Sequence, residues 1–438
     1  MERALVAIVG RPNVGKSTLF NRIAQQRLAI VEDTPGVTRD RLYANAKWLE
    51  REFLLIDTGG VTDESDHIQQ QIRKQVEIAL EEADAVIMVV DGRAPLTSSD
   101  HQVAAFLRKA KRPVVLAVNK IEDFGIQQID PEIYGFGLGE PIPVSAEHGR
   151  NIGDLLDAVL ATIPQRENEE ELDTIRITLA GRPNAGKSSL INALLGEERV
   201  IVSDQPGTTR DAIDTPLMHE EQRYLLVDTA GIRRKSKVET PVEYYSVLRA
   251  MRAIERSDVA ILVIDATRGV AEQDQRIGGM IKDAGKACII LVNKWDLIEK
   301  DNQTMDNYTD QIRDALNFLD YAPILFVSAT TGQRLTKLLP LVNQVMEAYT
   351  FRISTNRLNH FIGEVIALHH PPSNKGRMFK IYFTRQLGVK PPTFQFTVND
   401  PDGFHFSYQR YLENKLRESF GFVGTPIKFE TKIKTKES

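Results

Sequence analysis

Two glycine-rich segments of the chain carry residue types that bind phosphate groups. The first reads Gly10-Arg-Pro-Asn-Val-Gly-Lys-Ser, and the second, 171 residues later, reads Gly181-Arg-Pro-Asn-Ala-Gly-Lys-Ser. Each follows an apolar stretch typical of a buried strand and precedes a helical pattern, which is the context of a phosphate-binding loop. The glycines let backbone N–H groups surround phosphate oxygens. The lysine is predicted to contact the β- and γ-phosphates, and the serine after it to supply a hydroxyl to Mg²⁺.

An aspartate ends a later apolar strand of each copy and is followed by a glycine-containing turn. Asp57 precedes Thr-Gly-Gly, and Asp228 precedes Thr-Ala-Gly. A carboxylate in this place can hold the water shell of Mg²⁺, and the N–H of Gly60 or Gly231 can contact the γ-phosphate. Asp-Thr-Gly is also a favourable turn sequence, but that alternative does not explain its recurrence at a fixed distance from each loop.

Two further pairs of segments are predicted to bind the base. Asn119-Lys-Ile-Glu and Asn293-Lys-Trp-Asp each follow an apolar strand. Their acidic side chains can accept hydrogen bonds from the N1–H and the N2 amine of guanine, whereas adenine offers no such donor pair. Ser145-Ala and Ser328-Ala, again after apolar runs, are expected to direct a backbone N–H at the guanine O6. The two copies therefore predict two guanine-nucleotide sites.

The residues of the two predicted sites correspond one to one. The first site comprises Gly10, Arg11, Pro12, Asn13, Val14, Gly15, Lys16, Ser17, Thr18, Asp57, Thr58, Gly59, Gly60, Val61, Asn119, Lys120, Ile121, Glu122, Ser145 and Ala146. The second comprises Gly181, Arg182, Pro183, Asn184, Ala185, Gly186, Lys187, Ser188, Ser189, Asp228, Thr229, Ala230, Gly231, Ile232, Asn293, Lys294, Trp295, Asp296, Ser328 and Ala329.

The elements that position these residues are duplicated as whole domains. Residues 10–40 and 181–211 agree at 17 of 31 positions without a gap, and the offset drifts from 171 to 174 at the base-binding motifs. Apolar runs and helical patterns alternate, which predicts an α/β fold with a doubly wound, mainly parallel sheet in each copy. In the first copy strands are expected at residues 5–9, 53–56, 86–90 and 114–118, and helices at 18–24, 68–82 and 103–108.

A smaller module with a different order of predicted helices and strands follows the two copies. We expect a first nucleotide-binding domain at 1–164, an acidic linker at 165–174, a second nucleotide-binding domain at 175–350 and a C-terminal domain at 351–438. The last is predicted to be an α+β module of order α-β-β-α-β. Its helices are expected at 355–369 and 407–420, and its strands at 378–387, 393–399 and 425–434.

Composition and charge exclude several classes of protein. The apolar fraction of 42% and charged fraction of 26% are typical of a folded chain. No uninterrupted apolar run exceeds six residues, against about 18–20 for a membrane span. The single cysteine, Cys288, cannot form an intrachain disulfide, which favours the cytoplasm.

The net charge of −5 conceals an asymmetry. Residues 351–438 hold 14 Lys and Arg against 7 Asp and Glu, a net charge of +7, so the rest of the chain carries −12. The basic end is expected to meet a polyanion such as nucleic acid, with an ordinary basic surface as the alternative.

With these residues in place, the sequence resembles the tandem-GTPase family known as EngA or Der, within the Era-like group. The resemblance covers essentially the whole chain, including the C-terminal module, which is KH-like in that family. It implies GTP hydrolysis, GTP and GDP as ligands with Mg²⁺, and a bacterial protein that binds the 50S ribosomal subunit and its rRNA during late assembly. We expect a cytoplasmic monomer without a membrane span.

The resemblance also assigns single residues. Thr38 and Thr209 match the switch I threonine that coordinates Mg²⁺ in the GTP state, beside Ser17, Asp57, Ser188 and Asp228. Glu122 stands where the family motif has Asp. Its extra methylene moves the carboxylate by about one bond length, which predicts an altered affinity for guanine at the first site.

The hydrolytic residue of many signalling GTPases is replaced here. Val61 and Ile232 occupy the place where those enzymes carry a glutamine that orients the attacking water. Related GTPases use a K⁺ ion held in part by the asparagine of the phosphate-binding loop, which matches Asn13 and Asn184. K⁺-stimulated hydrolysis is therefore a hypothesis, with bracing of the loop by the asparagine side chain as the alternative.

The C-terminal module offers candidate RNA contacts. These are Lys428, Lys432, Lys434 and Lys436. The segment Gly421-Phe-Val-Gly matches the G-x-x-G of KH domains, but it lies between the last helix and the last strand, so we interpret it as a turn. The alternating aromatic residues are predicted to form core rather than a base-stacking surface. They are Phe394, Phe396, Phe404, Phe406 and Tyr408.

Two other functions stay open at this point. A GTPase partner in tRNA modification would need a cofactor-binding domain and a reactive C-terminal cysteine, and neither is visible in the sequence. A scaffold with inactive nucleotide-binding domains is disfavoured, because both copies keep the loop lysine, the Mg²⁺-side serine and the strand-end aspartate.

Overall fold

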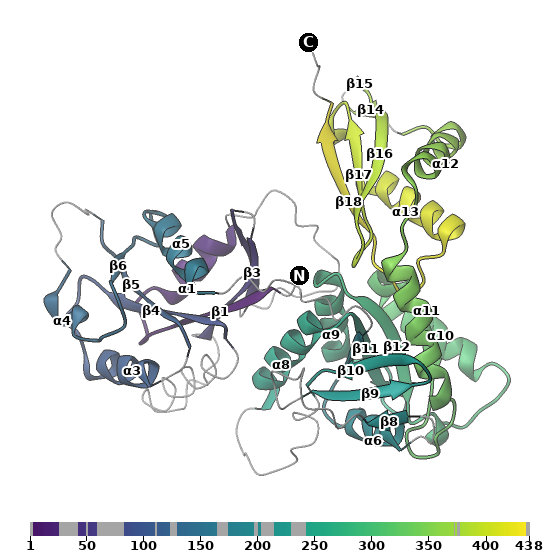
Figure 1. Cartoon of the computed structure of the whole chain (residues 1–438), viewed down its shortest axis with the longest axis horizontal. Helices are drawn as coiled ribbons and strands as arrows, with labels where there is room; N and C mark the ends of the chain where they lie inside the picture. Colours follow the sequence, from purple (N-terminus) through teal and green to yellow (C-terminus); the bar gives the residue numbers. More distant parts are fainter. Residues whose placement is uncertain are drawn as a thin grey trace. The chain divides into compact units, whose positions relative to one another are not determined.

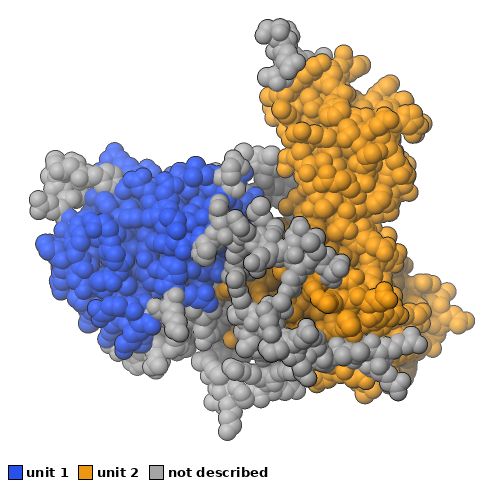
Figure 2. Space-filling model, in the orientation of Figure 1, with its two compact units in different colours: residues 1–170, 240–248 blue, residues 171–239, 249–438 orange. Residues whose placement is uncertain are grey.

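The computed structural model of the chain describes residues 3–25, 43–49, 51–58, 83–109, 112–122, 129–163, 174–196, 200–202, 214–228, 242–371, 373–374 and 377–434. The chain forms two compact units, one of residues 1–170 with 240–248 and one of residues 171–239 with 249–438 (Figure 2). The predicted helix at 68–82 and, apart from Thr174, the predicted acidic linker lie outside the described residues.

The first unit is built on a six-stranded sheet of order β2-β3-β1-β4-β5-β6 (Figure 1). β2 is antiparallel to β3, and the other neighbours are parallel. The strands are β1 (Ala4–Val9), β2 (Tyr43–Trp48), β3 (Arg51–Asp57), β4 (Ala85–Asp91), β5 (Val114–Asn119) and β6 (Ile142–Pro143). The helices are α1 (Lys16–Gln25), α3 (Ser98–Arg108), α4 (Pro131–Tyr134) and α5 (Ile152–Thr162).

Both faces of this sheet are buried, which explains its continuous apolar strands. Val6 and Ile8 of β1 pack into a core shared with α1 and α5, while Ala7 and Val9 pack into a core shared with α3. Helix α3 begins five residues before the predicted position 103. Its first turn is polar because Thr97 and Asp100 form a capping box there.

The second unit contains a seven-stranded sheet of order β13-β12-β11-β7-β10-β9-β8. Six of these strands repeat the plan of the first sheet, and β8 extends it beyond β9. The strands are β7 (Thr174–Ala180), β8 (Val200–Val202), β9 (Thr215–His219), β10 (Gln222–Leu226), β11 (Val259–Asp265), β12 (Ala287–Asn293) and β13 (Ile324–Phe326). The helices are α6 (Lys187–Leu195), α9 (Glu272–Asp283), α10 (Thr304–Ala315) and α11 (Leu338–Thr350), with 3₁₀ turns η2 (Trp295–Leu297), η3 (Asn317–Leu319) and η4 (Leu335–Lys337). Helix α8 (Val242–Arg256) belongs to the second unit from residue 249 on and to the first unit before it.

The C-terminal module completes the second unit. It consists of α12 (Thr355–Leu368), a short hairpin of β14 (Ser373–Asn374) and β15 (Arg377–Met378), β16 (Ile381–Gly388), β17 (Thr393–Val398), η5 (Pro401–Gly403), α13 (Phe406–Phe420) and β18 (Lys428–Ile433). The sheet order is β16-β17-β18. The predicted α/β class with two doubly wound sheets and a small α+β module is therefore confirmed.

Four of the five aromatic residues predicted to form core are buried in the module. Phe394, Phe396, Phe404 and Tyr408 are at most 6% exposed. The prediction is wrong for Phe406, which is 55% exposed and is the first residue of α13.

The turn at residues 421–424 packs the module against the second sheet. The Cys288 N–H of β12 donates to the Gly424 carbonyl oxygen at 2.7 Å, and the Gly424 N–H donates to the Tyr321 carbonyl oxygen at 2.9 Å. The Arg417 guanidinium lies 4.8 Å from the centre of the Tyr321 ring. The G-x-x-G-like segment is thus a packed turn, in agreement with its interpretation from the sequence. Among the described residues, no helix is long and apolar enough to cross a membrane.

Gly424→Ala should loosen this contact. Gly424 has φ +67°, and an added Cβ would lie 2.6 Å from Val345 Cγ2 and 3.0 Å from the Cys288 carbonyl oxygen. Overpacking of this kind costs about 1–3 kcal/mol, so hydrogen exchange of the peptide containing Cys288 should be faster. Gly363→Ala is the matched control, because no atom lies within 4 Å of its added Cβ. Unchanged exchange in Gly424→Ala would show that the contact does not hold the module.

Candidate functional site

Each phosphate-binding segment connects the central strand of its sheet to the next helix. Residues 10–15 join β1 to α1, and residues 181–186 join β7 to α6. β1 pairs with β3 on one side and β4 on the other, and β7 pairs in the same way with β10 and β11. The strand order reverses beside the central strand, which is where open α/β sheets bind ligands.

The second glycine of each segment is required by its surroundings. Gly15 has φ +94° and Gly186 has φ +96°, a conformation that residues with a Cβ rarely adopt. A Cβ at Gly15 would also overlap the carboxamide nitrogen of Asn119, and a Cβ at Gly186 would overlap that of Asn293. The glycine therefore lets the base-binding asparagine approach the phosphate-binding loop.

This asparagine joins three of the predicted segments through one side chain. Asn119 Nδ2 donates to the Val14 carbonyl oxygen at 2.9 Å, and its Oδ1 accepts from the Ala146 N–H at 3.0 Å. Asn293 repeats both bonds, at 3.0 Å to the Ala185 carbonyl oxygen and at 3.1 Å to the N–H of the corresponding alanine. Both asparagines are buried. The loop, the base-binding motif and the Ser-Ala segment therefore form one assembly in each copy.

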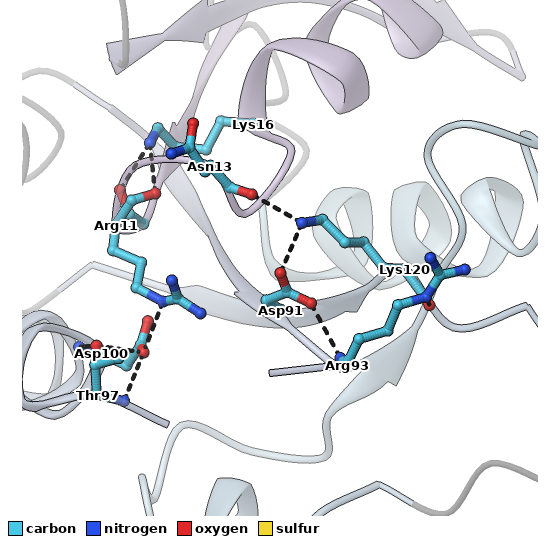
Figure 3. Close-up of polar contacts among 9 residues, drawn as sticks. Arg11, Asn13, Lys16, Asp91, Arg93, Thr97, Asp100 and Lys120 are labelled. Carbon is cyan, nitrogen blue, oxygen red and sulfur yellow. Dashed lines mark hydrogen bonds and ion pairs between the residues drawn. The ribbon is translucent and has the colours of Figure 1, made fainter. Parts of the chain in front are cut away.

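The lysine of each loop is held against its own backbone. Lys16 Nζ donates to the carbonyl oxygens of Gly10 at 2.8 Å and Arg11 at 2.9 Å (Figure 3). Lys187 Nζ donates to the equivalent carbonyl oxygens at 2.6 and 2.7 Å. Burial lowers the pKa of Lys16 to about 8 and that of Lys187 to about 8. The phosphates of a nucleotide would restore a charge partner to each ammonium group.

Serine and aspartate converge in the first site, as predicted for Mg²⁺ ligands. Ser17 Oγ donates to Asp57 Oδ2 at 2.6 Å. A hydroxyl and a carboxylate at hydrogen-bond distance form the hard oxygen donor set that Mg²⁺ prefers. In the second copy β10 ends earlier, at Leu226, and Asp228 follows it with φ +59°. The Asp228 N–H donates to Asp214 Oδ1 at 3.0 Å.

Part of both predicted sites lies outside the described residues. These residues are Thr38, Gly59, Gly60, Val61, Thr209, Thr229, Ala230, Gly231 and Ile232, together with Lys436 of the C-terminal end.

The two base-binding motifs differ in the environment of the acidic residue. Asp296 Oδ1 is buried and has no hydrogen-bond partner among the residues that the structure describes. A buried acceptor without a donor fits the N1–H and N2 amine of guanine. Glu122 instead forms an ion pair with Arg93, and its Oε1 lies 3.5 Å from His148 Nε2. The Glu122 carboxylate, predicted to accept from guanine at the first site, is therefore already paired with Arg93.

Two aspartates that the sequence predictions missed position the base-binding lysines. Lys120 Nζ donates to Asp91 Oδ2 at 2.6 Å and to the Asn13 carbonyl oxygen at 2.9 Å (Figure 3). Lys294 Nζ donates to Asp265 Oδ2 at 2.5 Å. Asp91 and Asp265 are the last residues of β4 and β11, and their offset of 174 matches that of the base-binding motifs.

A second missed pair anchors the arginine of each loop. Arg11 Nε donates to Asp100 Oδ2 at 3.0 Å (Figure 3), and Arg182 Nε lies 2.8 Å from Asp274 Oδ2. Both carboxylates lie in the first turn of a helix and are at most 1% exposed. Burial raises the pKa of Asp274 above its usual value, although Arg182 opposes the rise. The 174-residue offset also relates these two acids, so the repeat could have identified them.

The loop asparagines are exposed. Asn13 has φ +66° and Asn184 has φ +65°, a left-handed conformation that asparagine tolerates better than most residues. Neither side chain makes a hydrogen bond to another described residue, so the bracing alternative finds no support in that part of the chain. Their side-chain oxygens are available to a ligand.

The candidate RNA contacts lie on the last strand. Lys428 and Lys432 are on β18, Lys434 follows it, and all three are exposed. Their alternation places them on one face of an edge strand.

Comparison with known proteins matches this arrangement over the whole chain. The family described as "50S ribosome-binding GTPase" matches residues 5–120 and 176–294, and the family described as "KH-domain-like of EngA bacterial GTPase enzymes, C-terminal" matches residues 352–432. A protein named GTPase Der from Heliobacterium modesticaldum is 56% identical, with 100% of both chains covered. Proteins of the same name from Moorella thermoacetica and Caldanaerobacter subterraneus subsp. tengcongensis are each 55% identical, with 98% and 99% of both chains covered.

Above about pH 8, the binding of a nucleotide should be accompanied by the uptake of protons by the two loop lysines. Lys16 and Lys187 have a pKa of about 8, and phosphate raises it, so the affinity for GDP should fall by up to about tenfold per pH unit above 8. Isothermal titration of GDP at about pH 7 and about pH 8.5, in buffers of different ionisation enthalpy, measures the uptake directly. No proton uptake at the higher pH would contradict the assignment of these lysines to the phosphates. Lys109→Ala, a change at an exposed lysine of the first unit, should leave the uptake unaltered.

Proposed function

Because the chain belongs to the GTPase Der family and hydrolyses GTP, we propose that its two nucleotide sites act as switches in the late assembly of the 50S ribosomal subunit. The nucleotide at each site would set the affinity of the chain for the subunit, and hydrolysis would reset it. One of the two matched family descriptions names ribosome binding and neither mentions tRNA modification, so that alternative is not proposed.

The proposal is carried by the observation that one strand, β12, contacts both the second site and the basic C-terminal module. Its last residue, Asn293, holds the phosphate-binding loop through Ala185. Near its start, the Cys288 N–H is bonded to Gly424 of the module. A rigid buried strand can transmit a change at the base-binding end to the module that meets RNA.

The residues of each site have distinct tasks in binding GTP. Backbone N–H groups of the loop and the N-terminus of the following helix bind the phosphates. Lys16 and Lys187 neutralise the β- and γ-phosphates. Asp296 accepts the two guanine donors at the second site, and Glu122 does so at the first after exchanging its present partners. The N–H groups of Ala146 and Ala329 donate to the guanine O6.

Mg²⁺ belongs to the proposal as well. Ser17, Asp57 and Thr38 would hold it at the first site, and Ser188, Asp228 and Thr209 at the second. Bound there, it would neutralise the charge that develops between the β- and γ-phosphates.

K⁺ is proposed as the second cation of hydrolysis. Val61 and Ile232 cannot orient a water molecule by hydrogen bonding, since their side chains are apolar. The exposed oxygens of Asn13 and Asn184 can contribute to a K⁺ site beside the phosphates.

Asn13→Ala and Asn184→Ala should each abolish the K⁺ stimulation of one site. A positioned charge beside the transferred phosphate is worth about 10²–10³ in rate, so wild-type GTPase activity should be far higher in K⁺ than in Na⁺ at equal ionic strength. Steady-state phosphate release measures both. Equal rates in the two salts would remove K⁺ from the mechanism.

The large-subunit partner is tested by sedimentation with 50S subunits. Binding should be strongest with a slowly hydrolysed GTP analogue and weak with GDP. Lys16→Ala and Lys187→Ala remove a buried cation from the phosphates, which costs about 2–5 kcal/mol of nucleotide affinity, so the variant at the controlling site should lose nucleotide-dependent binding. The exposed-lysine variant Lys109→Ala is the control.

Absence of binding in every nucleotide state would contradict the assembly role and leave the GTPase activity intact. The proposal also takes the protein to act as a cytoplasmic monomer, with Lys428, Lys432, Lys434 and Lys436 contacting rRNA phosphates. Sedimentation at low and high salt measures that contribution.

A further inference from the structure

The sheet of the C-terminal module has one covered face and one open face. Both described helices of the module, α12 and α13, lie on the same face (Figure 1). Along β17, Phe394, Phe396 and Val398 are fully buried toward these helices, and they alternate with partly exposed residues. Residues at alternate positions point to opposite faces of a sheet. The partly exposed residues Thr393, Gln395 and Thr397 therefore lie on the open face.

A bulge in β16 brings two aromatic side chains to this open face. The register passes from the pair Ile381–Val398 to the pair Phe383–Thr397, so Tyr382 is the extra residue. Tyr382 is 47% exposed and Phe383 is 44% exposed, whereas the next residue, Thr384, is fully buried. Bulges of this type re-aim a side chain. Two neighbouring rings are thereby exposed on the same face, whereas in a regular strand one of the two would point toward the core.

Cations flank the two rings. Lys434 Nζ lies 4.3 Å from the centre of the Tyr382 ring, across β17. Lys432 is the register partner of Thr397, which is itself the partner of Phe383. Lys434 thus lies beside the Tyr382 ring, and Lys432 lies on the same open face, across β17 from Phe383.

The rest of the face is also mainly basic. Arg385 donates to Gln395 Oε1 at 3.1 and 2.9 Å, and Lys428 is exposed on the same face of β18. Glu430, the register partner of Gln395, is the one acid at an outward-facing position of the three strands. Four cations against one carboxylate, around two exposed rings, form a surface complementary to a flexible polyanion with free planar bases.

We infer that the open face binds single-stranded RNA, with bases stacked on Tyr382 and Phe383 and the phosphates beside Lys432 and Lys434. A duplex is the poorer occupant because its bases are stacked on each other and hidden from the rings. An acidic protein would satisfy the lysines but would not use the planar surface of the rings. This inference rests on the proposed function in that ribosomal RNA is the source of the strand, and it adds the class of RNA and the residues that read it.

The test measures binding of a fluorescently labelled single-stranded RNA of mixed sequence, about 12 nucleotides long, to the full chain by anisotropy. Tyr382→Ala with Phe383→Ala should weaken binding by about 25-fold or more, since each stacked base contributes a factor of about 5 to 150. Tyr382→Phe with Phe383→Tyr keeps both rings and should restore the affinity. The same RNA annealed to its complement should bind less tightly and should be insensitive to the alanine changes.

Matched controls separate stacking from folding and from charge. Phe406→Ala removes another exposed aromatic side chain of the module, 55% exposed, and should leave RNA affinity unchanged. GTPase activity of the double alanine variant should equal that of the wild type, which shows that its nucleotide-binding domains are folded. Lys432→Ala with Lys434→Ala should make the slope of log affinity against log salt concentration less steep. The change should correspond to the loss of about two phosphate contacts.

Three results would overturn the inference. They are no binding of the single strand by the wild type, full affinity in the double alanine variant, and equal loss of duplex and single-strand binding in that variant. If Tyr382→Ala with Phe383→Ala abolishes 50S binding but leaves the affinity for the RNA oligonucleotide unchanged, the face contacts a ribosomal protein and the inference is wrong. Failure of the proposed function is distinct, because the wild type would then bind the oligonucleotide through these rings and not bind 50S subunits in any nucleotide state.

Discussion

The structure of each nucleotide site depends on one buried carboxamide. Asn119 and Asn293 are at most 2% exposed and end the strand beside β4 or β11. Each satisfies a carbonyl of the phosphate-binding loop and an N–H of the Ser-Ala segment. A buried carboxamide that lost either partner would leave a polar group unsatisfied, at a cost of about 1–3 kcal/mol. The glycine before the loop lysine is required for the same reason, since any Cβ there would occupy the space of the amide. Phosphate and base recognition are therefore constrained together.

The two copies share this framework and differ where the base is read. In the second copy the position equivalent to Arg93 is Thr267, whose hydroxyl donates to Asp265 at 2.7 Å. Asp296 keeps a buried oxygen without a partner in the described part of the chain. In the first copy the longer Glu122 is paired with Arg93. The duplication has thus kept the residues that hold the loops and changed the residues around the acidic acceptor. These differences support the prediction that the two sites bind guanine unequally.

Sequence patterns predicted the parts of the fold in which a local pattern of residue types determines the structure. Continuous apolar runs identified the buried parallel strands, and both glycine-rich segments lie between a strand and a helix, as their sequences predict for phosphate-binding loops. The start of α3 was missed because its first turn is polar and capped by Thr97. Asp100 and Asp274 were missed because a lone acid in a helix has no local signature, and only the second copy at the 174-residue offset reveals it. The exposed pair Tyr382 and Phe383 could not be predicted either, because a bulge shifts the alternation on which such predictions depend.

The central claim is that one constraint builds two complete guanine-nucleotide sites in a single chain, and the stoichiometry of GDP binding tests it most directly. Equilibrium dialysis should give two GDP per wild-type chain, one per chain in Asn119→Ala or in Asn293→Ala, and none when both are changed. A wild-type stoichiometry of one, or two GDP retained after either substitution, would contradict the account.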